Sequence, residues 1–233
     1  MFTSRDVARV AGVSQSTVSY VMSGKRPISE KTRARVQAAI EQLTYQPNAG
    51  ARALATRRTQ VIGLVVAFGA ESDSTGLLPF LETITACARQ ADHDVLLVTA
   101  AEGASVLTRL GGRSLCDGIV LMDVGARDER VDVIASLRVP VVLIGVPDAA
   151  DGLTCVDVDF AEAGRQAVAE LVAAGCERVA VIGHAPDVLA RGLNYVARFQ
   201  RGVDQAVAAA GVPCAVVAPV EPSRAGARAA VAG

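Results

Sequence analysis

The chain from residue 61 onward is dominated by short apolar runs that alternate with amphipathic stretches. Six runs rich in valine, isoleucine and leucine follow one another, at 61–67, 94–99, 118–122, 141–145, 154–158 and 178–183. The clearest helical patterns lie at Leu77–Ala91, Phe160–Ala174 and Tyr195–Ala210. Continuous apolar strands separated by helices are typical of a parallel sheet that is covered on both faces. We therefore expect an α/β fold over this part of the chain.

The first 46 residues have a different pattern, which predicts three short helices. The expected caps are Thr3 with Asp6, Ser14 and Ser29 at the three starts, and Gly12 and Gly24 at the first two ends. The expected buried faces are Val7, Ala8, Val10 and Ala11, then Val18, Val21 and Met22, and then Val36, Ile40 and Leu43. Two helices joined by the tight "AGVS" turn and followed by a third helix indicate a helix-turn-helix domain.

Charge is divided unevenly along the chain. Residues 1–60 carry ten lysines and arginines against three aspartates and glutamates, whereas the rest of the chain carries 13 against 21. A basic first part joined to an acidic second part favours a polyanionic partner for the first part alone. The alternative is a chance cluster of charges on solvated helices.

Within a basic helix-turn-helix domain, the second helix is predicted to enter the major groove of DNA. The amide of Gln15 can pair with adenine, and Ser16 can hydrogen-bond to any base. The hydroxyls expected to contact phosphate oxygens are those of Thr3, Ser14, Thr17 and Ser19. The alternative is that these hydroxyls only cap helices or face solvent.

The sequence lacks the common signatures of enzymes, cofactor sites and metal sites. No glycine-rich dinucleotide or phosphate-binding motif follows a strand, and His93 and His184 have no histidine partner at metal-binding spacing. The five cysteines form no CxxC pair, which argues against a zinc knuckle or a disulfide framework. We expect no catalysis, no metal and no cofactor. No apolar run of about 20 residues and no signal peptide are found, so we expect a cytoplasmic protein without a membrane span.

The motifs of the first sixty residues resemble those of the lactose-repressor-type (LacI/GalR) family of bacterial transcription regulators. The resemblance rests on "DVARVAGVS", "TVS", "YQPN" and "NAGARAL", and it continues through "DGIV", "PVVLI" and "RVAVIG". It implies a helix-turn-helix domain over residues 1–46 and a hinge helix and linker over 47–60. It also implies a periplasmic-binding-protein-like α/β core over 61–233, with a first lobe at about 61–159 and a partial second lobe at about 160–233.

The resemblance further implies how such a chain meets DNA. Two copies form a homodimer on a near-palindromic operator, and the linker folds into a helix that inserts a leucine into the minor groove. The residues that match this linker are Asn48, Ala51, Arg52 and Leu54. Tyr20 stands where many members carry an arginine that can reach guanine, so an operator preference cannot be carried over.

For the α/β part, the resemblance implies a small-molecule effector, commonly a sugar or a nucleobase, between the two lobes. The candidate contacts are Asp73 and Asp159, for which loop solvation or helix capping is the alternative, and Arg198. The family often has an arginine three residues before a glycine that corresponds to Gly202. Here Phe199 occupies that position and Arg198 precedes it.

Members of the family usually continue beyond the length of this chain, so we expect a truncated regulator or a fragment. The function that the sequence predicts is an effector-responsive repressor that binds DNA sequence-specifically. The alternative is a sugar-binding module whose DNA binding is impaired by the truncation. A sugar-metabolising α/β enzyme is disfavoured because no catalytic constellation is found.

Overall fold

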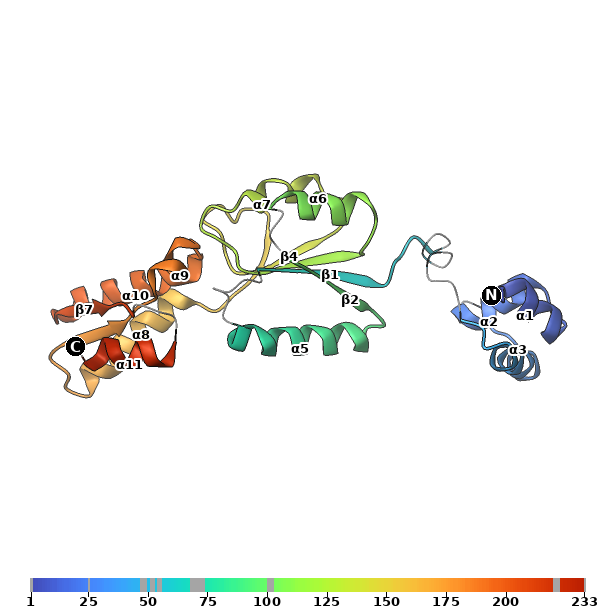
Figure 1. Ribbon diagram of the computed structural model, residues 1–233, viewed down its shortest axis with the longest axis horizontal. Coiled ribbons are helices and arrows are strands. Elements are labelled where there is room, and N and C mark those ends of the chain that lie inside the picture. The colour runs from blue at the N-terminus through green and yellow to red at the C-terminus, as the bar shows by residue number, and fades with distance from the viewer. Residues whose placement is uncertain are drawn as a thin grey trace. The chain divides into compact units, whose positions relative to one another are not determined.

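The computed structural model describes residues 2–24, 26–46, 50, 53, 56–67, 74–99, 103–219 and 223–232. The chain divides into two compact units, Met1–Thr59 and Gln60–Gly233, and each is considered by itself. Figure 1 labels most of the helices and strands of both units.

The described part of the first unit includes the helices α1 (Ser4–Ala11), α2 (Gln15–Ser23) and α3 (Glu30–Gln42). The predicted caps are confirmed. The Thr3 hydroxyl accepts a hydrogen bond from the Asp6 backbone N–H, and the Asp6 carboxylate accepts one from the Thr3 backbone N–H at 3.0 Å. Gly12 and Gly24 end the first two helices at φ values of 61° and 65°. Glycine suits both positions because this left-handed backbone brings the Cβ of other residues into conflict with the main chain.

The core of the first unit is small and consists of valine and alanine. Val7, Val18 and Val36 are fully buried, and each comes from a different helix. Two predicted core residues are wrong, because Val10 is 44% exposed and Met22 is 38% exposed. At 100° per residue, Val10 lies well to the side of the α1 face that carries Val7 and Ala11. Met22 lies one turn beyond Val18, at the C-terminal end of α2.

The second unit begins with a five-stranded parallel sheet in the order β2-β1-β3-β4-β5. The strands are β1 (Val61–Val66), β2 (Asp94–Thr99), β3 (Gly118–Leu121), β4 (Val141–Ile144) and β5 (Thr154–Val156). The connecting elements are α5 (Ser74–Gln90), α6 (Ser105–Gly112), α7 (Glu129–Asp132) and the short 3-10 helix η2 (Ile134–Ser136). Helix α5 covers one face of the sheet, and α6 and α7 lie over the other (Figure 1).

Successive side chains of β1 point to opposite faces of the sheet, as the alternation along a strand requires. Leu64 and Val66 pack in the cluster that includes Leu77 of α5. Val65 packs in the opposite cluster, which includes Leu107 and other residues of α6. Both clusters are buried, which explains why β1 is a continuous apolar run rather than an alternating one.

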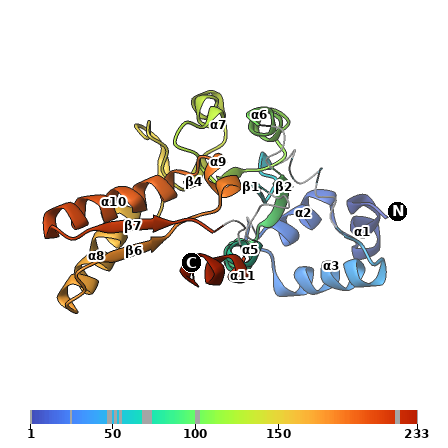
Figure 2. The same ribbon diagram turned by 60° about the vertical axis from the view of Figure 1, so that its left-hand side comes forward.

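The chain then crosses into a smaller second lobe. It contains α8 (Phe160–Ala173), β6 (Val179–Ile182), α9 (Pro186–Ala190), α10 (Asn194–Ala210), β7 (Cys214–Val217) and α11 (Arg224–Ala232). Strands β6 and β7 pair in parallel, and α8 and α10 lie beside them (Figure 2). Helices α8 and α10 approach closely at Gly202, where an added Cβ would collide with the carbonyl oxygen of Ala161. Only glycine fits there without moving one helix.

These two units give the predicted combination of a helical domain and a parallel α/β domain. None of the helices among the described residues combines the length and apolar character that crossing a membrane requires.

Candidate nucleic-acid interface and ligand cleft

Helix α2 presents a polar face away from the core of the first unit. Val18 is buried and Val21 half-buried on one side of the helix. The helical period places Ser16, Ser19 and Tyr20 on the other side. Ser16 and Ser19 are exposed and Tyr20 is half-buried, and α2 itself contains no charged residue. This face can therefore present hydroxyls and a phenol to a binding partner.

The N-terminus of α2 is held by hydrogen bonds within the first unit. Ser14 Oγ accepts from the Thr17 backbone N–H at 3.1 Å and is 2.8 Å from both Ser16 Oγ and Thr17 Oγ1. Gln15 Nε2 donates to Ser4 Oγ at 2.8 Å, which joins α2 to α1. Ser14 is therefore a helix cap in this structure. Its contact with DNA stays a prediction, as do those of the other predicted residues.

Two arginines of the first unit make ion pairs or hydrogen bonds within that unit. Arg9 pairs with Asp6 at 2.6 Å, and Arg35 of α3 donates to the backbone carbonyl oxygens of Ala11 and Gly12, the latter at 2.9 Å. Arg35 thus fixes the turn between α1 and α2 to α3. The remaining basic residues of this unit that are described include Arg5, Lys31 and Arg33, all exposed.

Five predicted site residues lie outside the described residues. They are Asn48, Ala51, Arg52 and Leu54 of the linker and Asp73 of the predicted effector site.

The second unit contains a cavity of about 270 Å³ at the carboxyl ends of strands β1, β3, β4 and β5. The sheet order places β2 and β3 on opposite sides of β1, and ligands of open α/β sheets bind at such a switch in strand order. Among the described residues, the charged ones that line it are Asp123, Asp157 and Arg191, and the aromatic ones are Phe80, Phe160 and Tyr195. Elements of both lobes contribute, so the cavity is a cleft between them.

Asp123 is fixed in the cleft by contacts on both of its sides. Its Oδ2 accepts from the Ala67 backbone N–H at 3.1 Å, which joins the ends of β3 and β1. Its Oδ1 lies 3.4 Å from Arg191 Nη2 of the second lobe. The side chains of Asp123 and Arg191 remain partly open to solvent, at 25% and 21% exposure. A ligand in the cleft can therefore reach both an acceptor and a donor.

A buried ion pair supports the backbone of Asp123. Arg130 donates from Nε to Asp128 Oδ1 at 2.8 Å and from Nη2 to Asp128 Oδ2 at 2.6 Å. Its Nη2 also donates to the Asp123 carbonyl oxygen at 2.7 Å. Burial raises the pKa of the Asp128 carboxyl, but hydrogen bonds from Arg130, its charge and backbone N–H groups outweigh burial and hold that pKa below its ordinary value.

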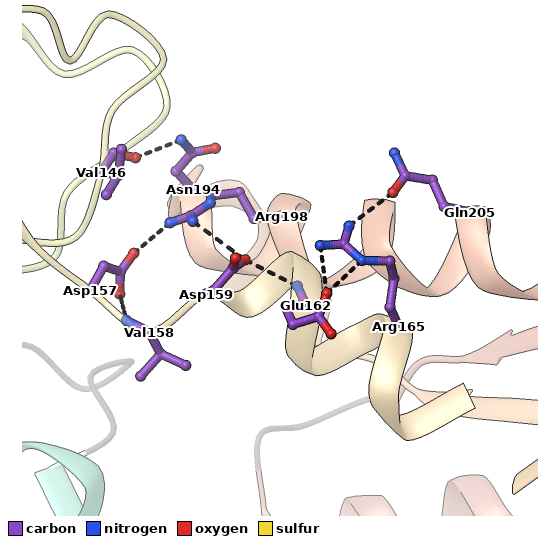
Figure 3. Close-up of polar contacts among 9 residues, drawn as sticks. All are labelled: Val146, Asp157, Val158, Asp159, Glu162, Arg165, Asn194, Arg198 and Gln205. Atoms are coloured by element: carbon purple, nitrogen blue, oxygen red, sulfur yellow. Dashed lines mark hydrogen bonds and ion pairs between the residues drawn. The ribbon is translucent and has the colours of Figure 1, made fainter. Parts of the chain in front are cut away.

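The two lobes are joined by hydrogen bonds behind the cleft. Asn194 is buried, and its Nδ2 donates to the Val146 carbonyl oxygen at 2.6 Å (Figure 3). The Ala126 backbone N–H donates to the Gly192 carbonyl oxygen at 3.1 Å, beside an antiparallel bridge between Gly125 and Leu193. These bonds tie the start of α10 to the loops that follow β3 and β4.

Figure 3 shows where the structure places two of the predicted effector residues. Arg198 Nη1 donates to Asp157 Oδ2 at 2.8 Å, and Arg198 Nη2 lies 3.9 Å from Asp159 Oδ1. Asp159 also caps α8, because its Oδ1 accepts from the Glu162 backbone N–H at 3.0 Å. Of these three side chains, Asp157 alone lines the described cleft.

The sequence patterns did not identify Asp123, Asp157 or Arg191 as residues of the cleft. A signal for Asp123 and Asp157 was present, because each lies close to the end of an apolar run, where the parallel strands reach the carboxyl edge of the sheet. Among the described residues, no group of histidine, cysteine, aspartate and glutamate is arranged to hold a metal ion.

The ion pair of Asp128 and Arg130 predicts a pH-dependent contribution to stability. The pKa of Asp128 is lower in the folded chain, so its carboxylate stabilises the fold above its ordinary value of 3.8 and loses this effect as the pH falls through the folded pKa. Asp128→Asn should lower the free energy of unfolding by about 3 kcal/mol at neutral pH, because it leaves the Arg130 charge buried without an anion. Urea unfolding at a series of pH values measures this difference, which should shrink as the medium becomes more acidic.

The matched control is Asp151→Asn, which changes an exposed carboxylate and should have little effect at any pH. A difference between Asp128→Asn and the unchanged chain that stayed constant into strong acid would contradict the assignment.

Both units of the chain match families of known proteins. Residues 3–48 match the family described as bacterial regulatory proteins, lacI family, and residues 59–232 match periplasmic binding proteins and sugar binding domain of LacI family. The regulator MalR of Streptococcus pneumoniae is 34% identical over 188 residues, which cover 78% of this chain and 56% of MalR. Catabolite control protein A of Priestia megaterium is 29% identical over 212 residues, 89% of this chain and 61% of the relative.

Solved structures give the same fold. The lac repressor dimer bound to operator and the anti-inducer ONPF matches with a TM-score of 0.73 at 22% identity, over 93% of this chain and 66% of that one. The transcriptional regulator CelR–cellobiose complex matches with a TM-score of 0.51 at 26% identity, over 94% of this chain and 66% of that one. The chain spans less than two thirds of the length of these relatives.

Proposed function

Because the chain belongs to the LacI family of bacterial regulatory proteins, we propose that it is a sequence-specific DNA-binding transcriptional regulator. The observation that carries the proposal is the exposed, uncharged polar face of α2 within a basic first unit. Hydroxyls and an amide can read base edges, while exposed arginines and lysines of the same unit neutralise phosphates.

The geometry of α2 supports Gln15 and Ser16 as the base-reading residues of this proposal. A recognition helix contacts bases mainly through its N-terminal residues. Gln15 and Ser16 occupy the first two positions of α2, and both are exposed. Gln15 exchanges its hydrogen bond with Ser4 for adenine N7 and N6, the edge that an amide pairs with bidentately. Thr3, Ser14, Thr17 and Ser19 supply hydroxyls near phosphate oxygens.

A dimer on a near-palindromic operator completes the proposal. Two copies related by a twofold axis present two α2 helices to two half-sites. The linker residues Asn48, Ala51, Arg52 and Leu54 contribute at the centre of such a site, with Leu54 as the minor-groove wedge that the family resemblance implies. Bound in this way, the chain acts as a repressor.

Replacement of Gln15, which removes one amide, tests whether the polar face of α2 reads bases. The unchanged chain should bind a selected palindromic site better than random DNA, and Gln15→Ala should weaken binding to that site by on the order of tenfold. Binding to random DNA should change little, because phosphate contacts carry that affinity. Gel-shift titrations at fixed salt concentration measure both affinities.

Gln37→Ala is the matched control, since it removes the same amide from the exposed surface of α3. Equal losses for the two variants, or no preference of the unchanged chain for any palindromic site, would refute the proposal. Ligand binding without site-specific DNA binding would instead favour a sugar-binding module.

The cleft of the second unit supports a small, neutral and hydroxylated effector such as a sugar. Asp123 and Asp157 accept hydrogen bonds from hydroxyls, Arg191 donates, and the rings of Phe80, Phe160 and Tyr195 provide apolar surface. The volume of about 270 Å³ lies just below the usual range of ligand pockets, which suits a ligand of about one ring. The CelR structure, a complex with cellobiose, gives a sugar precedent in a relative.

Thermal unfolding with a panel of neutral sugars, from glucose to cellobiose, tests this site. At least one sugar should raise the unfolding temperature of the unchanged chain, because a ligand that binds only the folded state stabilises it. Asp123→Asn should abolish the shift, whereas Asp151→Asn, a change of an exposed carboxylate outside the cleft, should retain it. A shift that survives Asp123→Asn would place the ligand elsewhere.

A further inference from the structure

The polar face of α2 lacks a group suited to guanine. Guanine presents two acceptors, O6 and N7, in the major groove, and the commonest specific contact to them is a bidentate one from arginine or lysine. Helix α2 contains hydroxyls, one amide and one phenol, but no basic residue. A cation that reads guanine beside this face must come from another part of the chain.

Arg26 meets this requirement. Its guanidinium carbon lies 5.0 Å from the centroid of the Tyr20 ring, within the range of a cation–π contact. Gly24 ends α2 in the left-handed conformation, and the chain after it brings Arg26 back against the helix. Tyr20 follows Ser16 by one turn, so the ring holds the guanidinium next to the proposed reading face.

The guanidinium keeps its donors available in this position. Arg26 is exposed, and among the described residues the ring of Tyr20 is the one contact of its charged group. A ring face attracts the cation without consuming its N–H groups, and the planar fork of arginine matches two acceptors in one plane. The contact with Tyr20 also restricts a long side chain that would otherwise move freely, which lowers the entropy lost on binding.

We propose that Tyr20 and Arg26 act as one specificity-determining pair, in which the Tyr20 ring positions Arg26 to read a guanine in each operator half-site. The inference rests on the proposed DNA-binding function. Arg26 donates two hydrogen bonds, to O6 and N7 of the guanine, and Tyr20 contributes through its ring rather than its hydroxyl. A phosphate contact is the competing role for an exposed arginine, and it carries no sequence information.

Selection of operators from random DNA by the full chain and its variants tests the pair. The unchanged chain should prefer guanine at one symmetric position of each half-site. Arg26→Ala should reduce discrimination at that position by on the order of tenfold and leave the other positions intact. Tyr20→Leu, which keeps an apolar side chain but removes the ring, should relax the same position. Tyr20→Phe should retain the preference.

Two controls separate positioning from general loss. The double variant Tyr20→Leu with Arg26→Ala should lose no more discrimination than Arg26→Ala alone, because both changes remove one contact. Arg33→Ala removes an exposed arginine from α3 and should preserve the preference at the guanine position. Matching thermal unfolding of all variants would show that the first unit stays folded.

The outcomes distinguish this inference from the function on which it rests. If Arg26→Ala weakens binding to all sequences equally and reduces the salt dependence by about one phosphate contact, Arg26 contacts phosphate and the inference fails while the DNA-binding function stands. If Tyr20→Leu leaves the guanine preference unchanged, the positioning role of the ring fails. If the unchanged chain selects no palindromic site, the proposed function and this inference both fail.

Discussion

The meeting of Val7, Val18 and Val36 is the contact on which the first unit depends. Helix α2 has nine residues, and an isolated helix of that length is marginal in water. It therefore depends on burial of Val18 against α1 and α3, and on the caps at Ser14 and Gly24. The same burial fixes the rotation of α2, because turning Val18 inward turns Ser16 and Ser19 outward. The packing that buries Val18 therefore also exposes the polar face of α2.

In the second unit, the position of the cleft residues depends on the common direction of the strands. All strands of the first lobe run in parallel, so the residues that follow β3 and β5 gather at one edge of the sheet. Asp123 and Asp157 meet the second lobe there through Arg191 and Arg198. The buried pair of Asp128 and Arg130 holds the backbone of this edge in place. The cleft therefore combines a rigid sheet edge with charged contacts that a ligand can compete for.

Local features of both units could be predicted from the sequence, whereas contacts between distant residues could not. The caps at Thr3, Ser14 and Gly24 depend on residues within one turn, so their spacing revealed them. The exposure of Met22 depends on how far the neighbouring helices extend, which the periodicity of the sequence does not contain. The position of Val10 to the side of the buried face of α1 follows from the helical period and could have been predicted.

The pairing of Asp123 with Arg191 and the stacking of Arg26 on Tyr20 likewise depend on the path of the chain between the partners.

A dimethyl sulfate footprint of the full chain on a selected operator tests the central claim, that the exposed face of α2 and the Arg26 guanidinium beside it read DNA in the major groove. The reagent methylates guanine N7 in the major groove and adenine N3 in the minor groove, so it separates the two surfaces. We predict protection of guanine N7 in two symmetric half-sites. Guanine N7 that stays fully reactive in both half-sites would contradict the account.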